Sequence, residues 1–199
     1  LISMKTLPES IVEHSRRLPE GGLLSAKEFL HLGSRAAVDQ ALSRLAKAGR
    51  LIRATRGLYL AAITDQGRYL APAIDKVVSA LASKNQEEIV LDGARSANML
   101  GLSAQVPRGD AFLTNGRART LQVGEVTAEI RHAPLWMLAL GSTTAGAVIR
   151  ALAWLGERRI GGVMEALRKQ LAPSDWHALS SVRSILPSWM ALAIGREVG

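Results

Sequence analysis

Cysteine is absent from this sequence of 199 residues. Disulfide bonds, cysteine-ligated zinc, iron–sulfur clusters and thiol catalysis are therefore excluded. Histidine is scarce, and the four residues His14, His31, His132 and His177 show neither HxxxH nor HExxH spacing. The chain also lacks a P-loop and a glycine-rich dinucleotide fingerprint. We therefore expect a protein that is not an enzyme and that binds no metal and no cofactor.

Charged residues make up only 21% of the sequence, whereas 48% of the residues are apolar. This balance is typical of a folded protein with a substantial core. Residues 1–22 lack the apolar run and the small-residue cleavage site of a signal peptide. We therefore expect the protein to be cytoplasmic.

One uncharged stretch, residues 133–149, is about as short as a membrane span can be. Pro134, Gly141 and the three hydroxyl residues at 142–144 interrupt it. Either of the first two hydroxyl residues is well placed to cap a second helix. We therefore predict a pair of buried helices here and no association with a membrane.

Two helices joined by a tight turn are predicted near the N-terminus. Ser25 and Glu28 have the spacing of a capping box, in which each side chain accepts a bond from an amide of the first turn. We expect Gly33 to end this helix in the left-handed conformation and Ser34 to cap the next one. Gly49 closes the second helix. Its apolar residues recur at spacings of three and four and form one buried stripe: Val38, Ala41, Leu42 and Leu45.

A short hairpin is predicted directly after the second helix. Apolar and β-branched residues stand on either side of a turn at Thr55-Arg56-Gly57. With a further helix at about residues 9–17, the order of these elements is that of a winged helix-turn-helix.

Positive charge is concentrated in the second helix and the hairpin. From Arg35 to Arg56 there are six cations and one anion, so these 22 residues contribute +5 of the net charge of +8. Such a basic surface fits a polyanion such as DNA. A solvated basic face with no nucleic-acid partner is the alternative.

The geometry of DNA grooves assigns a role to each polar residue of this region. A helix in the major groove reads base edges mainly with its N-terminal half, so Arg35 and Gln40 are the first candidates for base reading. Lys47 and the wing residues are assigned to phosphates or to the minor groove. The predicted recognition-helix residues are Ser34, Arg35, Gln40, Ser43, Arg44 and Lys47. The predicted wing residues are Arg53, Thr55 and Arg56.

We place the winged helix-turn-helix domain at residues 1–64 and a second domain at residues 65–199. Helical periodicity over residues 63–82, which includes Tyr69 and Leu70, either links the two domains or opens the second one. Asn115-Gly116 predicts a hairpin with a type I′ turn between strands at residues 110–114 and 118–123.

Other elements of the second domain follow from alternation, helical spacing and turn residues. We expect strands at 88–92 and 125–132, a helix at 94–100, and helices from Pro134 onward with breaks near Gly156, Gly161, Pro173 and Pro187. The four tryptophans at helical spacing are interpreted as core residues. The predicted fold class is α+β: an N-terminal winged helix-turn-helix, then a mixed domain with a small antiparallel sheet and a helical C-terminal part.

Gly33-Ser34 is also similar to the opening of a nucleotidyltransferase signature, in which Gly-Ser holds phosphate and two carboxylates bind magnesium. Only Asp39 follows at short range. The turn of a helix-turn-helix is therefore the preferred interpretation. The apolar C-terminal segment, residues 186–199, either completes the core or binds a partner, and we favour the core.

Several segments together resemble one protein family. They are SRAAVDQALSRLAKAGRLIRATRGLYL, ARSANMLGLSAQVPRGDAFLTNGRARTLQVG, EIRHAPLWMLAL and VIRALAWLG. These resemble AbiEi-type antitoxins of type IV toxin-antitoxin systems. The most specific parts of the resemblance are ANMLGLSAQVP and TNGRARTLQVG.

The resemblance implies a transcriptional autorepressor whose winged helix binds double-stranded DNA at inverted repeats of its own promoter. It also implies a C-terminal domain needed to counteract a nucleotidyltransferase-like toxin, with direct contact to that toxin left open. Two other interpretations stay open. One is an ordinary winged-helix regulator whose second domain senses a ligand or partner, and the other is an interaction protein whose basic helix contacts RNA or an acidic protein.

Overall fold

The computed structural model describes residues 5–199 and has an α+β fold. The chain folds into two compact units. The first unit contains residues up to Glu87 together with Thr120–Ala128, and the second contains Glu88–Arg119 and Glu129–Gly199. The domain boundary predicted between residues 64 and 65 stays a prediction. Residues 1–4 of the predicted first domain lie outside the described part of the chain.

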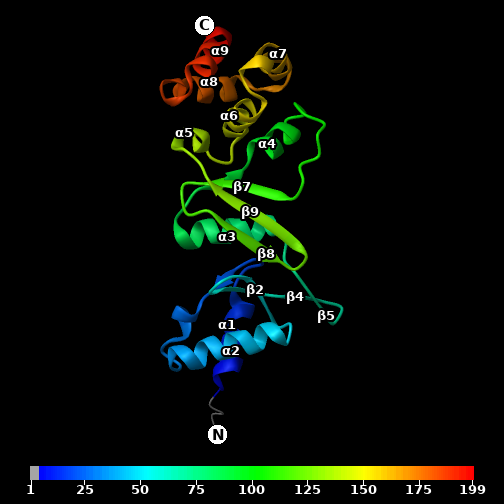
Figure 1. The fold of residues 1–199 in the computed structure, drawn as a ribbon, viewed down its shortest axis with the longest axis vertical. Helices are drawn as coiled ribbons and strands as arrows, with labels where there is room; N and C mark the ends of the chain where they lie inside the picture. Colours follow the sequence, from blue (N-terminus) through cyan, green and yellow to red (C-terminus); the bar gives the residue numbers. More distant parts are fainter. Residues whose placement is uncertain (1–4) are drawn as a thin grey trace. The chain divides into compact units, whose positions relative to one another are not determined.

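A winged helix-turn-helix forms most of the first unit (Figure 1). Its elements are α1 (Leu7–Arg17), β1 (Leu23–Leu24), the 3-10 helix η1 (Ala26–Phe29), α2 (Arg35–Lys47), β2 (Leu51–Thr55) and β3 (Leu58–Ala61). The strands have the order β1-β3-β2. The apolar faces of α1, η1 and α2 pack around one core that includes Ile11, Phe29, Val38 and Leu42. The predicted order of helices and wing is thus confirmed.

The first helix of the helix-turn-helix is shorter than predicted. Its expected capping contact forms, since the Ser25 amide donates to the Glu28 carboxylate at 2.8 Å. The helix nevertheless spans only four residues and is 3-10 helical, as is usual for such short pieces. Gly33 is not among the described residues with positive φ. The left-handed helix end predicted at Gly33 is therefore wrong, because the helix has already ended at Phe29.

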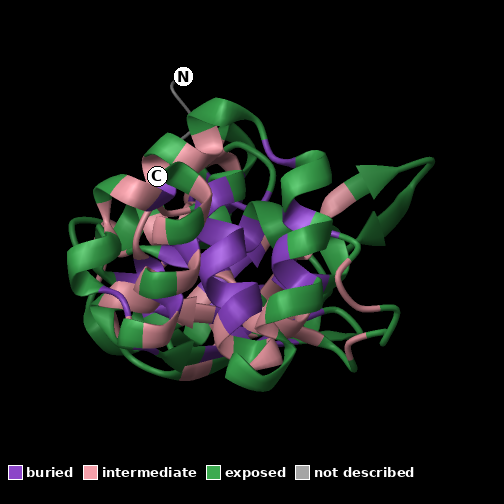
Figure 2. Cartoon of the chain, turned by 90° about the horizontal axis from the view of Figure 1, so that it is seen from above, coloured by how far each residue is buried: buried purple, intermediate pink, exposed green. Residues whose placement is uncertain are grey.

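Residues 63–70 form a hairpin, so the helix predicted over residues 63–82 is wrong in its first half. Strands β4 (Ile63–Asp65) and β5 (Arg68–Leu70) pair with each other in a sheet of their own. Gln66 and Gly67 between them have φ values of 46° and 78°, and two such positive values are what a type I′ turn requires. This hairpin is the exposed arm that projects from the first unit in Figure 2.

The second half of that segment is helical, as α3 (Ile74–Asn85). The helix groups with the first unit, and its Lys76 forms an ion pair with Glu20. Gly21 has a φ of 81°, and a Cβ at this position would lie 2.7 Å from the Lys76 carbonyl carbon. The close approach of the two backbones therefore depends on glycine. Of the two roles left open for this segment, α3 therefore does not open the second unit, which begins at Glu88.

A four-stranded sheet follows, and its strand order differs from the predicted one. Strands β6 (Ile89–Leu91), β7 (Asp110–Thr114), β8 (Arg119–Val123) and β9 (Val126–His132) have the order β6-β7-β9-β8. β7 is not paired with β8, so the hairpin predicted at Asn115-Gly116 is wrong. Neither residue has a positive φ. The Asn115 side-chain oxygen instead accepts a bond from the Glu88 amide at 2.9 Å, and the tight turn lies at Gly124, between β8 and β9.

The second unit is otherwise helical. Its helices are α4 (Gly93–Met99), α5 (Leu135–Leu138), α6 (Thr144–Leu155), α7 (Ile160–Gln170), α8 (Pro173–Ser181) and α9 (Ser188–Val198), with the 3-10 helices η2 (Glu157–Arg159) and η3 (Arg183–Ile185). Helix α6 is central, because eight consecutive residues from Ala145 to Leu152 are buried. The predicted helix cap after Gly141 is confirmed: the Thr143 hydroxyl accepts from the Gly146 amide at 3.1 Å.

Most predicted helix boundaries and core residues of this unit are confirmed. Helices end or begin at Gly156, Pro173 and Pro187. Gly161 lies inside α7, so the break predicted there is wrong. Three tryptophans pack against the core, whereas Trp154 is 40% exposed. No helix of the described residues is long and apolar enough to cross a membrane.

Arg150 is a charged residue in the interior of the second unit. It is 2% exposed, and its guanidinium donates to the carbonyl oxygen of Gly141 at 3.0 Å. Burial lowers its pKa to about 10, an effect that the nearby carboxylate of Glu88 partly offsets. The side chain therefore stays charged at neutral pH and holds the loop between α5 and α6, where Leu140 has a left-handed φ of 63°.

Candidate nucleic-acid interface

Helix α2 is the second helix of the helix-turn-helix, the position that a recognition helix occupies in this fold. The Ser34 hydroxyl accepts from the Ala37 amide at 3.2 Å, so the predicted N-cap is confirmed. The predicted apolar stripe of Val38, Ala41, Leu42 and Leu45 is buried. After the helix, Gly49 adopts a φ of 73°, as predicted for a helix end. These contacts hold one face of α2 against the core and leave the opposite face free.

The free face of α2 carries the predicted polar residues in a definite arrangement. With 3.6 residues per turn, Ala36, Gln40, Ser43 and Lys47 lie along its middle. Arg35 and Arg44 lie on its two edges. All of these side chains are exposed except that of Ser43, which is partly buried. The methyl group of Ala36 leaves room for a close approach to the middle of this face.

Arg35 is the predicted base-reading residue with a defined partner. Its Nε donates to the Asp39 carboxylate at 2.9 Å, an i,i+4 pair on the helix surface. This bond occupies Nε and favours one orientation of the guanidinium. The two terminal nitrogens are not in that bond, and they are the donors that a bidentate contact with guanine uses.

The wing is a hairpin with a two-residue loop, Arg56-Gly57. Gly57 has a φ of 78°, and apart from its own atoms and those of its two chain neighbours no atom of residues 5–199 lies within 4 Å of the position of a Cβ there. Backbone conformation rather than crowding therefore favours glycine at the tip. Arg53 and Arg56 are exposed and Thr55 is partly exposed, so all three predicted wing residues are accessible.

Most of the positive charge in this region is not neutralised by the protein. Among residues 5–199, Arg35 is the one cation of α2 and the wing with an ion pair. The other cations have none: Arg44, Lys47, Arg50, Arg53 and Arg56. A set of unpaired cations on one helix and the adjoining hairpin is the electrostatic pattern of a phosphate-binding surface.

Arg50 and Arg68 are accessible cations that were not among the residues predicted to contact DNA. Arg50 is exposed between α2 and β2, and it was counted among the six cations of residues 35–56. Arg68 lies on the exposed β5 strand of the β4–β5 hairpin. It was missed because the segment was interpreted as helical, although the Gln66-Gly67 pair is a turn signal.

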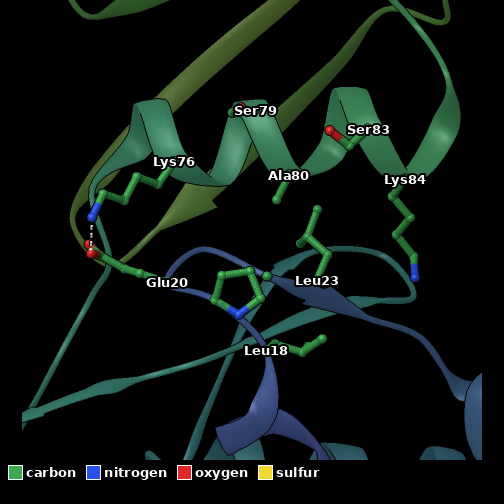
Figure 3. A pocket seen from close by; sticks show the side chains of 10 residues that line it. Leu18, Glu20, Leu23, Lys76, Ser79, Ala80, Ser83 and Lys84 are labelled. Carbon is green, nitrogen blue, oxygen red and sulfur yellow. Dashed lines mark hydrogen bonds and ion pairs between the residues drawn. The ribbon is translucent and has the colours of Figure 1, made fainter.

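A groove lies in the first unit between α3 and the loop after α1, with a volume of about 460 Å³. Figure 3 shows Leu18 and Leu23 on one side and Ala80 on the other, with the Glu20–Lys76 ion pair at one end. The α3 side chains between Lys76 and Lys84 that line the groove are short: Ser79, Ala80 and Ser83. It lies apart from the residues of α2 and the wing that form the candidate interface.

The described residues contain no group of three or more acidic or histidine side chains that could hold a metal ion. Ser34 uses its hydroxyl as a helix cap, and Asp39 is paired with Arg35. The Gly33-Ser34 dipeptide therefore lies in the turn of the helix-turn-helix, the preferred interpretation of the sequence.

The fold and the exposed basic helix define a two-unit α+β protein with an N-terminal winged helix-turn-helix. The chain belongs to DUF6088, a family of unknown function, whose model matches residues 10–173. No curated protein matches the sequence significantly. Among solved structures, the chain is similar to the RV2827C protein from Mycobacterium tuberculosis, with a TM-score of 0.55 and 14% identity over 98% of this chain and 77% of that one. This likeness concerns the fold alone.

Proposed function

We propose that this protein is a DNA-binding transcriptional autorepressor that acts as the antitoxin of a type IV toxin-antitoxin system. The toxin of that system would be a nucleotidyltransferase-like protein, and toxin and antitoxin would both act in the cytoplasm. DNA binding is supported by the exposed face of α2 together with the unpaired cations of α2 and the wing. The antitoxin role is supported by the resemblance of the sequence to AbiEi-type antitoxins.

The single observation that carries DNA binding is the placement of Gln40, Ser43 and Lys47 along one exposed helix face beside a basic wing. A protein helix of this size fits the major groove of B-DNA, and the wing would meet the adjoining backbone. The central residues would contact base edges. The surrounding cations would contact phosphates and set the salt dependence.

A mobility-shift series with the region upstream of the protein's own gene tests this proposal. The measurement is the dissociation constant at several salt concentrations, for that region and for random DNA of equal length. We expect at least about a thousandfold tighter binding to the upstream region. A steep salt dependence without any preference for that region would reject operator recognition.

The antitoxin role needs a separate experiment. The adjacent reading frame is examined for a nucleotidyltransferase and expressed with and without this protein. Rescue of growth is expected. Absence of such a neighbour, or failure of rescue with operator binding intact, would reject the antitoxin role and leave an ordinary winged-helix regulator, the second candidate. An open pocket between η3 and α9 in the second unit favours this second candidate.

A further inference from the structure

The second unit has a pocket between η3 and the outward face of α9, with a volume of about 600 Å³. Helix α9 places Met190 and Ile194 in the core, where both are fully buried. Its other face therefore carries Leu192, Gly195 and Arg196, which line the pocket. The helix thus completes the core, as favoured from the sequence, and still presents a second surface.

Gly195 shapes the pocket by letting Arg183 lie against the backbone of α9. A Cβ at residue 195 would be 3.2 Å from the guanidinium carbon of Arg183. The planar guanidinium therefore lies directly against the helix. Its position is set by η3, which packs on α9. The guanidinium of Arg183 and the side chain of Arg196 both line the pocket.

Neither arginine of the pocket has an ion pair among residues 5–199. The nearest carboxylate in sequence, Glu197, is engaged elsewhere: Arg168 Nη2 donates to it at 2.6 Å. Two cations without protein counter-charges therefore face an open pocket. Groups that complement them are carboxylates or phosphates.

The pocket also has an apolar side. Leu192 is 64% exposed and lies on the face of α9 opposite the buried Met190 and Ile194. Leu186 lies beneath, almost fully buried. Arginine is enriched in protein interfaces, and the buried centre of such an interface is more apolar than its rim.

We propose that this pocket binds an acidic segment of a partner protein that also carries an apolar side chain. Carboxylates of the segment pair with Arg183 and Arg196, and its apolar side chain covers Leu192. RNA is the less favoured occupant, because two cations neutralise only two phosphates and the pocket has no aromatic ring on which a base can stack. The proposal does not depend on DNA binding by the first unit.

Fluorescence polarisation with a labelled peptide of alternating glutamate and leucine tests the proposal on the full chain. We expect saturable binding to the wild-type protein. Peptides with lysine in place of glutamate, or serine in place of leucine, should bind at least about tenfold more weakly. Failure of the wild-type protein to bind the glutamate–leucine peptide would overturn the proposal.

Variants of exposed residues locate the binding. Arg183→Glu, Arg196→Glu and Leu192→Ser should each weaken binding by about tenfold or more. The matched control is Arg158→Glu, which makes the same charge change at an exposed residue of η2 that has no ion pair among residues 5–199 and lies outside the pocket. Circular dichroism shows whether each variant is folded.

Two results would reject the pocket as a site for acidic protein segments. One is an equal loss of peptide binding in Arg158→Glu and Arg183→Glu, which would indicate attraction by overall charge. The other is displacement of the peptide by an RNA hairpin that binds more tightly and requires Arg183, which would assign the pocket to nucleic acid. Neither result depends on whether the first unit recognises an operator.

Discussion

At the scale of single residues, the arginines of the candidate interface differ in whether an ion pair within the protein orients their guanidinium group. Arg35 is held by Asp39 through its Nε, whereas Arg56 lies at the tip of the wing without an ion pair among residues 5–199. An oriented guanidinium suits a directional contact with a base edge. A free one at a hairpin tip suits a phosphate, whose attraction depends little on direction.

We expect Arg35→Ala to relax sequence preference, at a cost of about 1–3 kcal/mol on the operator and little on random DNA. Arg56→Ala should weaken binding to both DNAs alike and reduce the salt slope by about one. The measurement is a binding titration on both DNAs at several salt concentrations. Arg158→Ala in the second unit is the control with an equal loss of charge. Equal losses on the two DNAs for Arg35→Ala would contradict its role in base reading.

At the scale of elements, glycine permits the close packing of α4 against α6. A Cβ on Gly93 would lie 2.5 Å from the Cβ of Trp154 and 2.6 Å from the carbonyl oxygen of Arg150. Neither atom can move without shifting α6, because one is a carbonyl oxygen of its backbone and the other is the first side-chain atom. Around Gly161 in α7, in contrast, no atom of the described residues lies within 4 Å of such a position, apart from its chain neighbours and the backbone of its own helix.

Gly93→Ala should therefore destabilise the protein by about 1–3 kcal/mol through overpacking. Gly161→Ala should stabilise it by up to about 1 kcal/mol, because alanine favours the helix and meets no neighbour. Urea unfolding followed by circular dichroism measures both changes. Similar free energies of unfolding for the two variants would contradict the packing inferred at α4 and α6.

At the scale of the whole molecule, α3 groups with the winged helix-turn-helix and not with the second unit. The backbone of Gly21 packs against that of Lys76, and exposed ion pairs join Glu20 to Lys76 and Glu28 to Lys84. Since exposed ion pairs contribute about 0–1 kcal/mol, packing is the main reason for α3 to stay in place.

A fragment that ends at residue 87 should consequently be more stable than one that ends at residue 64. The longer fragment retains α3 and its contacts with the loop after α1, so it should unfold cooperatively at the higher temperature. Differential scanning calorimetry of the two fragments measures this. As a control, Lys76→Ala in the full chain should change stability by less than about 1 kcal/mol. A fragment of residues 1–64 that is as stable as the longer one would support the boundary predicted from the sequence.

Much of the candidate interface was predictable because its signals are local. The cap at Ser34, the buried stripe from Val38 to Leu45 and the turn at Gly57 each depend on residues within a few positions along the chain. Because the residues that form them are close in sequence, a local pattern is enough to indicate them. The helical period that places Val38 to Leu45 in the core also predicted that Arg35 and Gln40 are exposed.

Strand pairing in the second half of the chain was not predictable in this way. Asn115-Gly116 has the composition of a hairpin turn, yet the Asn115 side chain accepts from Glu88, which is distant in sequence. β9 then takes the place beside β7 that the local signal assigned to β8. Likewise, the β4–β5 hairpin was obscured by an apolar spacing that also fits a helix, although Tyr69 and Leu70 are exposed.

The sequence by itself determined the winged helix-turn-helix, its exposed basic face and the positions of most helix ends. Only the tertiary structure decided that α3 packs on the first unit, that β9 separates β7 from β8, and that Arg183 lies over Gly195 beside Leu192. The physical reason is the range of the interactions. Caps, turns and helical stripes depend on near neighbours in the sequence, whereas strand order and pockets depend on residues that meet after the chain has folded.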